Sequence, residues 1–122
     1  MTTFNLVVLY VKDSDASAAF YETLLGQPIA QSSPKFSMLP LGGGGMLGLW
    51  QRDAVEPSVG NESGGGEIAF SVADTNAVNA THETWKARGA KIAQAPTTLP
   101  FGHSFVALDP DGHRLRVLAP AN

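Results

Sequence analysis

Cysteine is absent from the 122 residues of this chain, and charged side chains make up only 16% of it. The lack of cysteine excludes disulfides, thiolate zinc sites and cysteine nucleophiles. Eight Lys and Arg against eleven Asp and Glu leave a formal charge of −3, and so few cations do not build a nucleic-acid-binding face. No apolar run approaches the ~18 residues of a membrane helix, and the N-terminus lacks the pattern of a secretory signal. We therefore expect a cytoplasmic protein with no nucleic-acid or membrane partner.

Hydrophobic residues and glycine are abundant. Hydrophobic side chains make up 43% of the chain, which is typical of a packed domain and not of a disordered segment. Two glycine runs, Gly42–Gly45 and Gly64–Gly66, interrupt it. Neither run is followed by the Lys-Ser/Thr pair of a phosphate-binding loop. We interpret the runs as a hairpin turn and a linker.

An internal repeat is the most informative feature of the sequence. The segment that starts at Val11 matches the segment that starts at Val72, sixty-one positions later. The identical pairs are Val11/Val72, Asp13/Asp74, Ala16/Ala77, Ala19/Ala80, Glu22/Glu83 and Thr23/Thr84. Such a repeat indicates one supersecondary unit used twice.

Each repeat is predicted to be a strand, a helix and three further strands. In the first, a strand over residues 4–11, buried on most of its surface, precedes a helix capped by Asp13 or Ser14 and ended by Gly26. Shorter strands follow near residues 28–31, 35–41 and 46–51. The second has strands at 67–72, 91–95, 104–109 and 114–118 and a helix from 75 to about 87. The prediction is an α+β fold of two βαβββ modules, residues 1–52 and 67–122, joined by a linker over 53–66.

Several of these segments resemble the vicinal oxygen chelate superfamily, which includes glyoxalase I, extradiol dioxygenases and bleomycin-resistance proteins. The resemblance rests on Val11-x-Asp13, Phe20-Tyr21, Leu24-Leu25-Gly26 and the Asp-Pro-Asp-Gly-His string of residues 109–113. It implies paired βαβββ modules whose mixed sheets curl around a cavity. It also implies a homodimer in which each cavity combines the first module of one chain with the second module of the other.

In enzymatic members, three positions hold a divalent metal ion. By resemblance these positions fall on Leu6, Glu67 and Arg116, and Leu6 and Glu67 are themselves sixty-one residues apart. Leu6 has no donor atom and Arg116 is a fixed cation, so we expect no metal and no cofactor. The histidines do not offer a substitute: His82 is expected on a solvent-facing helix surface, His103 in a loop, and His113 in a structural turn.

Strand alternation assigns the candidate ligand contacts, because neighbouring side chains point to opposite faces of a sheet. If Leu6 faces the cavity, Tyr10 in the same strand faces it too. Trp50 is expected to face the cavity as well, because its place in the first module corresponds to that of Arg116 in the second. Gly48 would leave room for a ligand, whereas Trp85 is expected in the core. For Phe101, His103 and Phe105, ligand contact and structural packing remain equally open. The full set of expected contacts is Tyr10, Phe36, Met38, Met46, Gly48, Trp50, Glu67, Phe101, His103, Phe105 and Arg116.

These residues suit a flat apolar ligand better than metal chemistry. The resemblance extends to the metal-free drug-binding branch, in particular phenazine-antibiotic resistance proteins, through Asn5-Leu6, Leu49-Trp50, Phe101-Gly102, Phe105 and Arg116. It implies a binding protein that sequesters an aromatic antibiotic without altering it. The alternatives are a glyoxalase- or dioxygenase-type enzyme with non-standard metal ligands, and a non-catalytic partner whose cavity has collapsed. Glu67 and Arg116 are expected to pair if they are buried, because an unpaired buried charge costs several kcal/mol.

Overall fold

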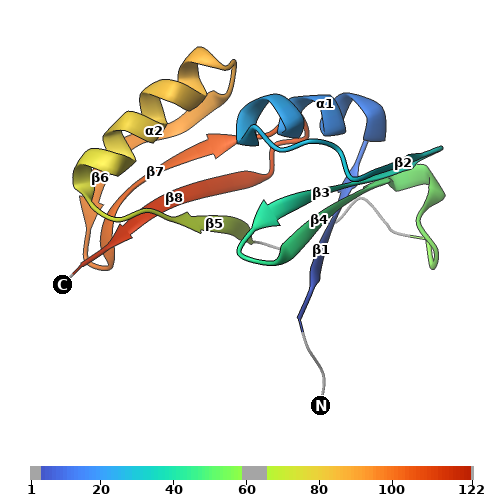
Figure 1. Ribbon diagram of the computed structural model, residues 1–122, viewed down its shortest axis with the longest axis horizontal. Helices are drawn as coiled ribbons and strands as arrows, with labels where there is room; N and C mark the ends of the chain where they lie inside the picture. Colours follow the sequence, from blue (N-terminus) through green and yellow to red (C-terminus); the bar gives the residue numbers. More distant parts are fainter. Residues whose placement is uncertain (1–3, 59–65, 122) are drawn as a thin grey trace. The chain divides into compact units, whose positions relative to one another are not determined.

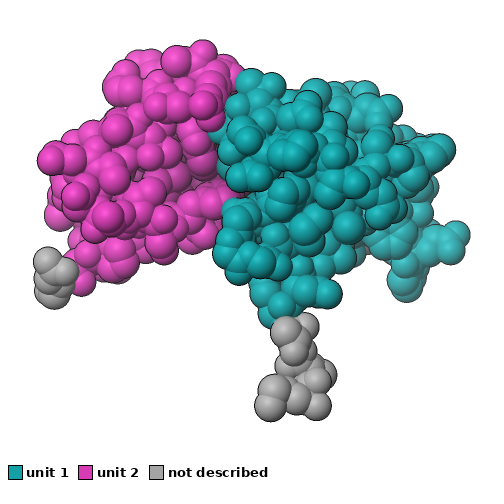
Figure 2. Space-filling model, viewed as in Figure 1, with its two compact units in different colours: residues 1–63 teal, residues 64–122 magenta. Residues whose placement is uncertain are grey.

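The computed structural model describes residues 4–58 and 66–121. The chain divides into two units, Met1–Ser63 and Gly64–Asn122, which are coloured separately in Figure 2. Each unit consists of one four-stranded mixed sheet and one long helix (Figure 1). The βαβββ order that the repeat predicts is therefore confirmed in both halves.

In the first unit the sheet order is β1-β4-β3-β2, with β1 and β4 parallel and the other pairs antiparallel. Its elements are β1 (Leu6–Val11), α1 (Ser14–Leu25), β2 (Gln31–Ser33), β3 (Phe36–Gly42), β4 (Gly45–Gln51) and the short helix η1 (Arg52–Ala54). The hairpin between β3 and β4 turns at Gly43 and Gly44, whose positive φ angles of 60° and 90° suit glycine. The first glycine run is thus a turn, as predicted, whereas most of the second lies outside the described residues.

The second unit repeats this topology with the order β5-β8-β7-β6. Its elements are β5 (Glu67–Ser71), α2 (Thr75–Ala87), β6 (Lys91–Leu99), β7 (Gly102–Leu108) and β8 (Arg114–Pro120). Again only the first and last strands, β5 and β8, pair in parallel. Of the helices that the structure describes, none is long and apolar enough to cross a membrane.

The repeated aspartates begin the two long helices. Asp13 and Asp74 have extended backbones, and each side chain accepts a hydrogen bond from the backbone N–H three residues later, at 3.1 and 2.8 Å. Such bonds satisfy N–H groups that the helix itself leaves free. Gly26 ends α1 in the left-handed conformation, with φ of 67°. These local interactions explain why both helices were predictable from the repeat.

Each helix covers one face of its own sheet. In the first unit α1 packs on β3 and β4. The fully buried apolar side chains there are Tyr21, Leu24, Leu39, Leu47 and Leu49. In the second unit Trp85 of α2 is buried and makes edge-to-face contacts with Phe70 and Phe105, at 5.7 and 5.6 Å between ring centroids. The prediction that Trp85 belongs to the core is confirmed.

Three sequence-based expectations are wrong in detail. The first strand is not buried on most of its surface: Leu6 and Tyr10 are 37% and 38% exposed, and only Val11 is buried, because β1 is an edge strand with one face away from α1. His82 does not face solvent, since its side chain is 12% exposed and its ring lies 5.3 Å from that of Phe105. His103 lies in β7 and not in a loop.

The predicted boundaries shift most where strands are irregular. The strand expected at residues 28–31 is found at Gln31–Ser33. The strand expected at 91–95 continues to Leu99, because register shifts after Ile92 and Gln94 allow pairing with β7 to resume. Part of the expected linker, residues 53–66, belongs to η1, and residues 59–65 of it lie outside the described part of the chain.

One buried polar group in the first unit has no partner among the described residues. Ser37 of β3 is fully buried, and its hydroxyl makes no hydrogen bond. A buried hydroxyl that loses its bonds to water destabilises the folded state. We therefore predict that Ser37→Ala raises the free energy of unfolding by about 1 kcal/mol, measured by urea denaturation.

Ser104→Ala is the matched control for this prediction. Ser104 is equally buried, but its hydroxyl accepts a hydrogen bond from Arg116 at 2.9 Å. The same substitution should therefore lower stability at position 104. Equal losses at both positions would contradict the prediction.

Candidate functional site

The face of the first sheet opposite α1 is formed by rows of residues paired across its strands. Directly paired residues in neighbouring strands point to the same face. Tyr10 pairs with Trp50 and Trp50 pairs with Phe36. The neighbouring rows are Val8, Gly48 and Met38, and Leu6, Met46 and Pro40. The structure thus brings together on one open face all six ligand contacts expected from this module: Tyr10, Phe36, Met38, Met46, Gly48 and Trp50.

Aromatic rings dominate one end of this open face. Phe36 and Trp50 pack edge to face, with ring centroids 6.3 Å apart and an interplanar angle of 89°. Both are half-buried, and Tyr10 is 38% exposed. Such aromatic groups combine a large apolar surface with a flat stacking face.

Gly48 allows close packing within this face. A Cβ atom there would lie 3.2 Å from the Phe36 ring and 3.4 Å from a Leu6 methyl group. The space above Gly48 is therefore occupied by Phe36 and Leu6. The sequence suggests that the missing side chain leaves room for a ligand, and the structure shows that it leaves room for these two neighbours.

The corresponding face of the second sheet has an ion pair at its centre. Arg116 of β8 donates from Nε to Glu67 Oε1 at 2.6 Å and from Nη2 to Glu67 Oε2 at 3.3 Å. Its Nη1 donates to the hydroxyl of Ser104 at 2.9 Å. The Phe101 ring centroid lies 5.4 Å from the guanidinium carbon, which is within cation–π range. The pairing of Glu67 with Arg116 is as expected from the sequence.

This donor set does not fit the metal site implied by the resemblance. Both carboxylate oxygens of Glu67 accept hydrogen bonds from Arg116, whose positive charge opposes a cation. Leu6 offers only hydrocarbon. A catalytic site of this kind needs about three protein ligands and one open position, and these residues supply one engaged carboxylate.

Another cluster of possible ligands forms a turn. Donor atoms of Asp109, Asp111 and His113 lie within 4.8 Å of one another. Asp109 Oδ1 accepts the backbone N–H groups of Asp111 and His113 at 2.9 and 2.8 Å, and Oδ2 lies 2.6 Å from His113 Nδ1. The buried Asp109 side chain thus closes the turn that leads into β8, which agrees with the structural role expected for His113.

Two expected ligand contacts lie on the other face of the second sheet. Phe105 is fully buried against His82 and Trp85. His103 Nε2 lies 3.1 Å from Asn79 Oδ1 in α2, and Nδ1 lies 2.9 Å from Thr98 Oγ1. Neither side chain shares the face of Arg116.

Sequence reasoning missed Ser104, although it contacts Arg116. The signal for it was the alternation within β7, where Ser104 points opposite to His103 and Phe105. The alternation places Ser104 on one face of β7 and His103 and Phe105 on the other. Only the burial of Phe105 under α2 shows that the face of His103 and Phe105 is the one that the helix covers.

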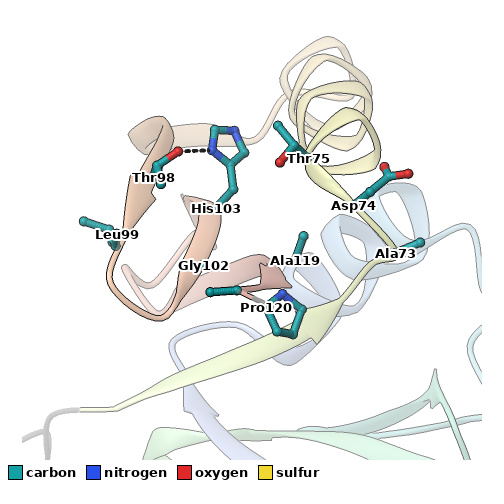
Figure 3. Close-up of a pocket in the computed structure, with 10 residues that line it drawn as sticks. Ala73, Asp74, Thr75, Thr98, Leu99, Gly102, His103, Ala119 and Pro120 are labelled. Atoms are coloured by element: carbon teal, nitrogen blue, oxygen red, sulfur yellow. Dashed lines mark hydrogen bonds between the residues drawn. The ribbon is translucent and has the colours of Figure 1, made fainter.

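A pocket of about 280 Å³ lies on the His103 side of the β6–β7 hairpin. It is lined by residues at the start of α2, in the hairpin and at the end of β8 (Figure 3). Figure 3 shows the His103 ring beside Thr98, with Thr75 of α2 across from it. The pocket is thus separate from the open face that bears Arg116.

Comparisons with known proteins agree with this architecture. The sequence pattern of the glyoxalase/bleomycin resistance protein/dioxygenase superfamily matches residues 3–117. The chain belongs to this superfamily.

The relatives include a resistance protein. The phenazine antibiotic resistance protein EhpR of Enterobacter agglomerans is 26% identical over 118 residues, which are 94% of this chain and 90% of the relative. A protein of Agrobacterium tumefaciens with a solution structure is 46% identical over the whole of both chains, with a TM-score of 0.88. A glyoxalase-related enzyme of Fulvimarina pelagi, 22% identical, shares the fold with a TM-score of 0.83 over 98% of this chain and 88% of its own.

The donor set predicts that this superfamily member binds no divalent metal tightly. Calorimetric titration with Ni²⁺, Zn²⁺ and Mn²⁺ and elemental analysis of the purified protein should both give no stoichiometric metal, because Leu6 and Arg116 cannot ligate. One tightly held ion per chain would contradict this. Glu67→Gln and Asp109→Asn would then locate the ion on the open face or in the turn.

Proposed function

We propose that the protein is a metal-free binding protein that sequesters a flat aromatic small molecule, of the kind represented by aromatic antibiotics. The observation that supports this most directly is the row of Tyr10, Trp50 and Phe36 on the open face of the first sheet. These side chains are half-buried or exposed and present mainly flat apolar ring surface. They suit the stacking of a planar ring.

Burial and stacking of a flat ring are the main sources of binding energy available for this role. Burying about 300 Å² of apolar surface at about 25 cal/mol per Å² contributes ~7 kcal/mol before the cost of association. A ring stacked on an aromatic side chain adds about 0.5–1.5 kcal/mol. Together these terms come to about 8 kcal/mol before the cost of association is subtracted, so contacts beyond this single stack are needed for micromolar affinity.

The relative named as a phenazine antibiotic resistance protein supports the ligand class. Phenazine is a flat tricyclic aromatic molecule, so its dimensions match a surface built from Trp50 and its neighbours. The alternative, a metal-dependent enzyme, is disfavoured by the bidentate pairing of Glu67 with Arg116. A cytoplasmic location, expected from the sequence, remains part of this proposal.

Trp50 is predicted to be a principal ligand contact. Trp50→Ala should weaken the binding of phenazine-1-carboxylate by about tenfold, or about 1.4 kcal/mol, because it removes a stacking surface. Calorimetry measures this directly, and a thermal-shift screen of flat aromatic antibiotics would precede it. Since Trp50 is only half-buried, the variant should still fold.

Trp85→Phe provides the control for this prediction. The chain has two tryptophans, and Trp85 of α2 is buried against the second sheet. Trp85→Phe should therefore keep both binding and ligand-induced quenching of fluorescence. Unchanged affinity in Trp50→Ala, or quenching that disappears with Trp85, would show that the assigned face is wrong.

A homodimer is the second part of the proposal. The resemblance implies that modules from two chains complete each binding cavity, and two-fold dimers are the commonest soluble oligomers. Light scattering at a protein concentration of tens of micromolar should therefore give twice the chain mass of 12.8 kDa. A species of 12.8 kDa would contradict the dimer.

A further inference from the structure

The tip of the β6–β7 hairpin positions an aromatic ring on the open face of the second sheet. Leu99 pairs with Gly102, and the turn between them contains Phe101. Phe101 is 49% exposed, yet its ring lies against the guanidinium group of Arg116 at 5.4 Å. One side of the ring is therefore in contact with a cation while much of its surface stays accessible.

The tip of this hairpin is also attached to the end of β8. The backbone N–H of Ala121 donates to the carbonyl of Phe101 at 3.0 Å. At Gly102, a Cβ atom would lie 2.3 Å from the carbonyl oxygen of Ala119, so only glycine permits this approach. These contacts hold the tip of the hairpin at its edge with β8, with which β7 pairs along its whole length.

His103 connects the hairpin to α2 on the opposite side. The amide oxygen of Asn79 can only accept, so His103 Nε2 donates to it across 3.1 Å. In the neutral ring, Nδ1 then accepts from the Thr98 hydroxyl at 2.9 Å. The imidazole thus joins both strands of the hairpin to the helix.

The pocket described above lies beside the link that His103 makes between the hairpin and α2. A space of about 280 Å³, lined by Thr75, Thr98 and His103, lies between the hairpin and the start of α2 (Figure 3). Side-chain packing therefore supports the tip of the hairpin less than it supports Phe105, which is buried against His82 and Trp85 of α2. On this side of the tip, the hydrogen bonds of His103 to Thr98 and Asn79 supply a direct link to α2.

We propose that His103 is a positioning residue that holds Phe101 against Arg116, and so shapes the second sheet's open face for its ligand. His103 does not touch the ligand; it acts through Phe101, on the other side of the hairpin. The ligand part of this inference rests on the proposed function. The positioning of Phe101 does not, and it is measurable in the ligand-free protein.

The first test uses the NMR signal of the Arg116 Nε–H group. An aromatic ring shifts the resonances of nearby protons, so Phe101→Leu defines the signal of an uncovered Arg116. Asn79→Ala and His103→Leu should each move the Arg116 signal by at least half of the shift that Phe101→Leu causes relative to the unaltered protein. His103→Gln, which keeps a donor and an acceptor, should restore it at least partly.

Asn79→Ala makes the test robust, because it replaces an exposed helical residue with the best helix former. Its thermal stability should be unchanged or higher, so a shift at Arg116 would not reflect unfolding. Thr84→Ala is the matched control, since the Thr84 hydroxyl bonds only to the backbone of α2. The inference is overturned if Phe101→Leu moves the Arg116 signal while Asn79→Ala and the folded His103 variants leave it unchanged.

The second test measures binding of phenazine-1-carboxylate by calorimetry. Asn79→Ala should weaken binding about threefold, as expected when a cation–π-stacked ring is no longer held in place. Unchanged affinity, despite a displaced Phe101, would overturn the role of His103 in ligand binding. If the unaltered protein does not bind this probe, the proposed function fails, and the NMR test still decides whether His103 positions Phe101.

Discussion

A four-stranded sheet with one helix packed on it buries only one of its two faces, and the candidate site depends on this constraint. In each unit the long helix covers the face formed by fully buried apolar side chains, such as Leu47 and Leu49 in the first and Phe105 in the second. On the opposite face most side chains are half-buried or exposed, although Ser104 and Val106 of β7 are buried there. Any function of the chain that needs a broad binding surface can use these faces without disturbing the core.

The two open faces have diverged although they arise from one repeated unit. Leu6 and Glu67 are equivalent in the repeat, but one contributes a methyl group beside Gly48 and the other a carboxylate to Arg116. The superfamily includes metal-dependent enzymes, and the equivalent positions here are occupied by a hydrocarbon and a closed ion pair. A guanidinium bonded to Glu67 and Ser104 is a fixed cation that needs no metal ion to balance the carboxylate. The donor set of this chain therefore differs from the metal site that the resemblance implies, although the fold is shared.

Much of the fold could be predicted because its signals are local. Asp13 and Asp74 cap helices through atoms three residues away, and the Gly43-Gly44 turn depends only on backbone angles. The aromatic face of the first sheet was also predictable, since alternation along β1 and β4 places Tyr10 and Trp50 in the same row. Boundaries were less certain in β6, where the register shifts depend on pairing with β7 and leave no clear mark in the sequence.

The sequence by itself determined the repeat, both long helices, the superfamily resemblance and the residues that share a face within each strand. Only the tertiary structure decided which of the two faces is covered, because alternation gives relative and not absolute orientation. It therefore decided that Phe105 and His103 lie on the helix side, that Phe36 and Leu6 occupy the space above Gly48, and that Ser104 joins Arg116. These are contacts between residues far apart in the chain, and they exist only once strand pairing and helix packing bring the residues together.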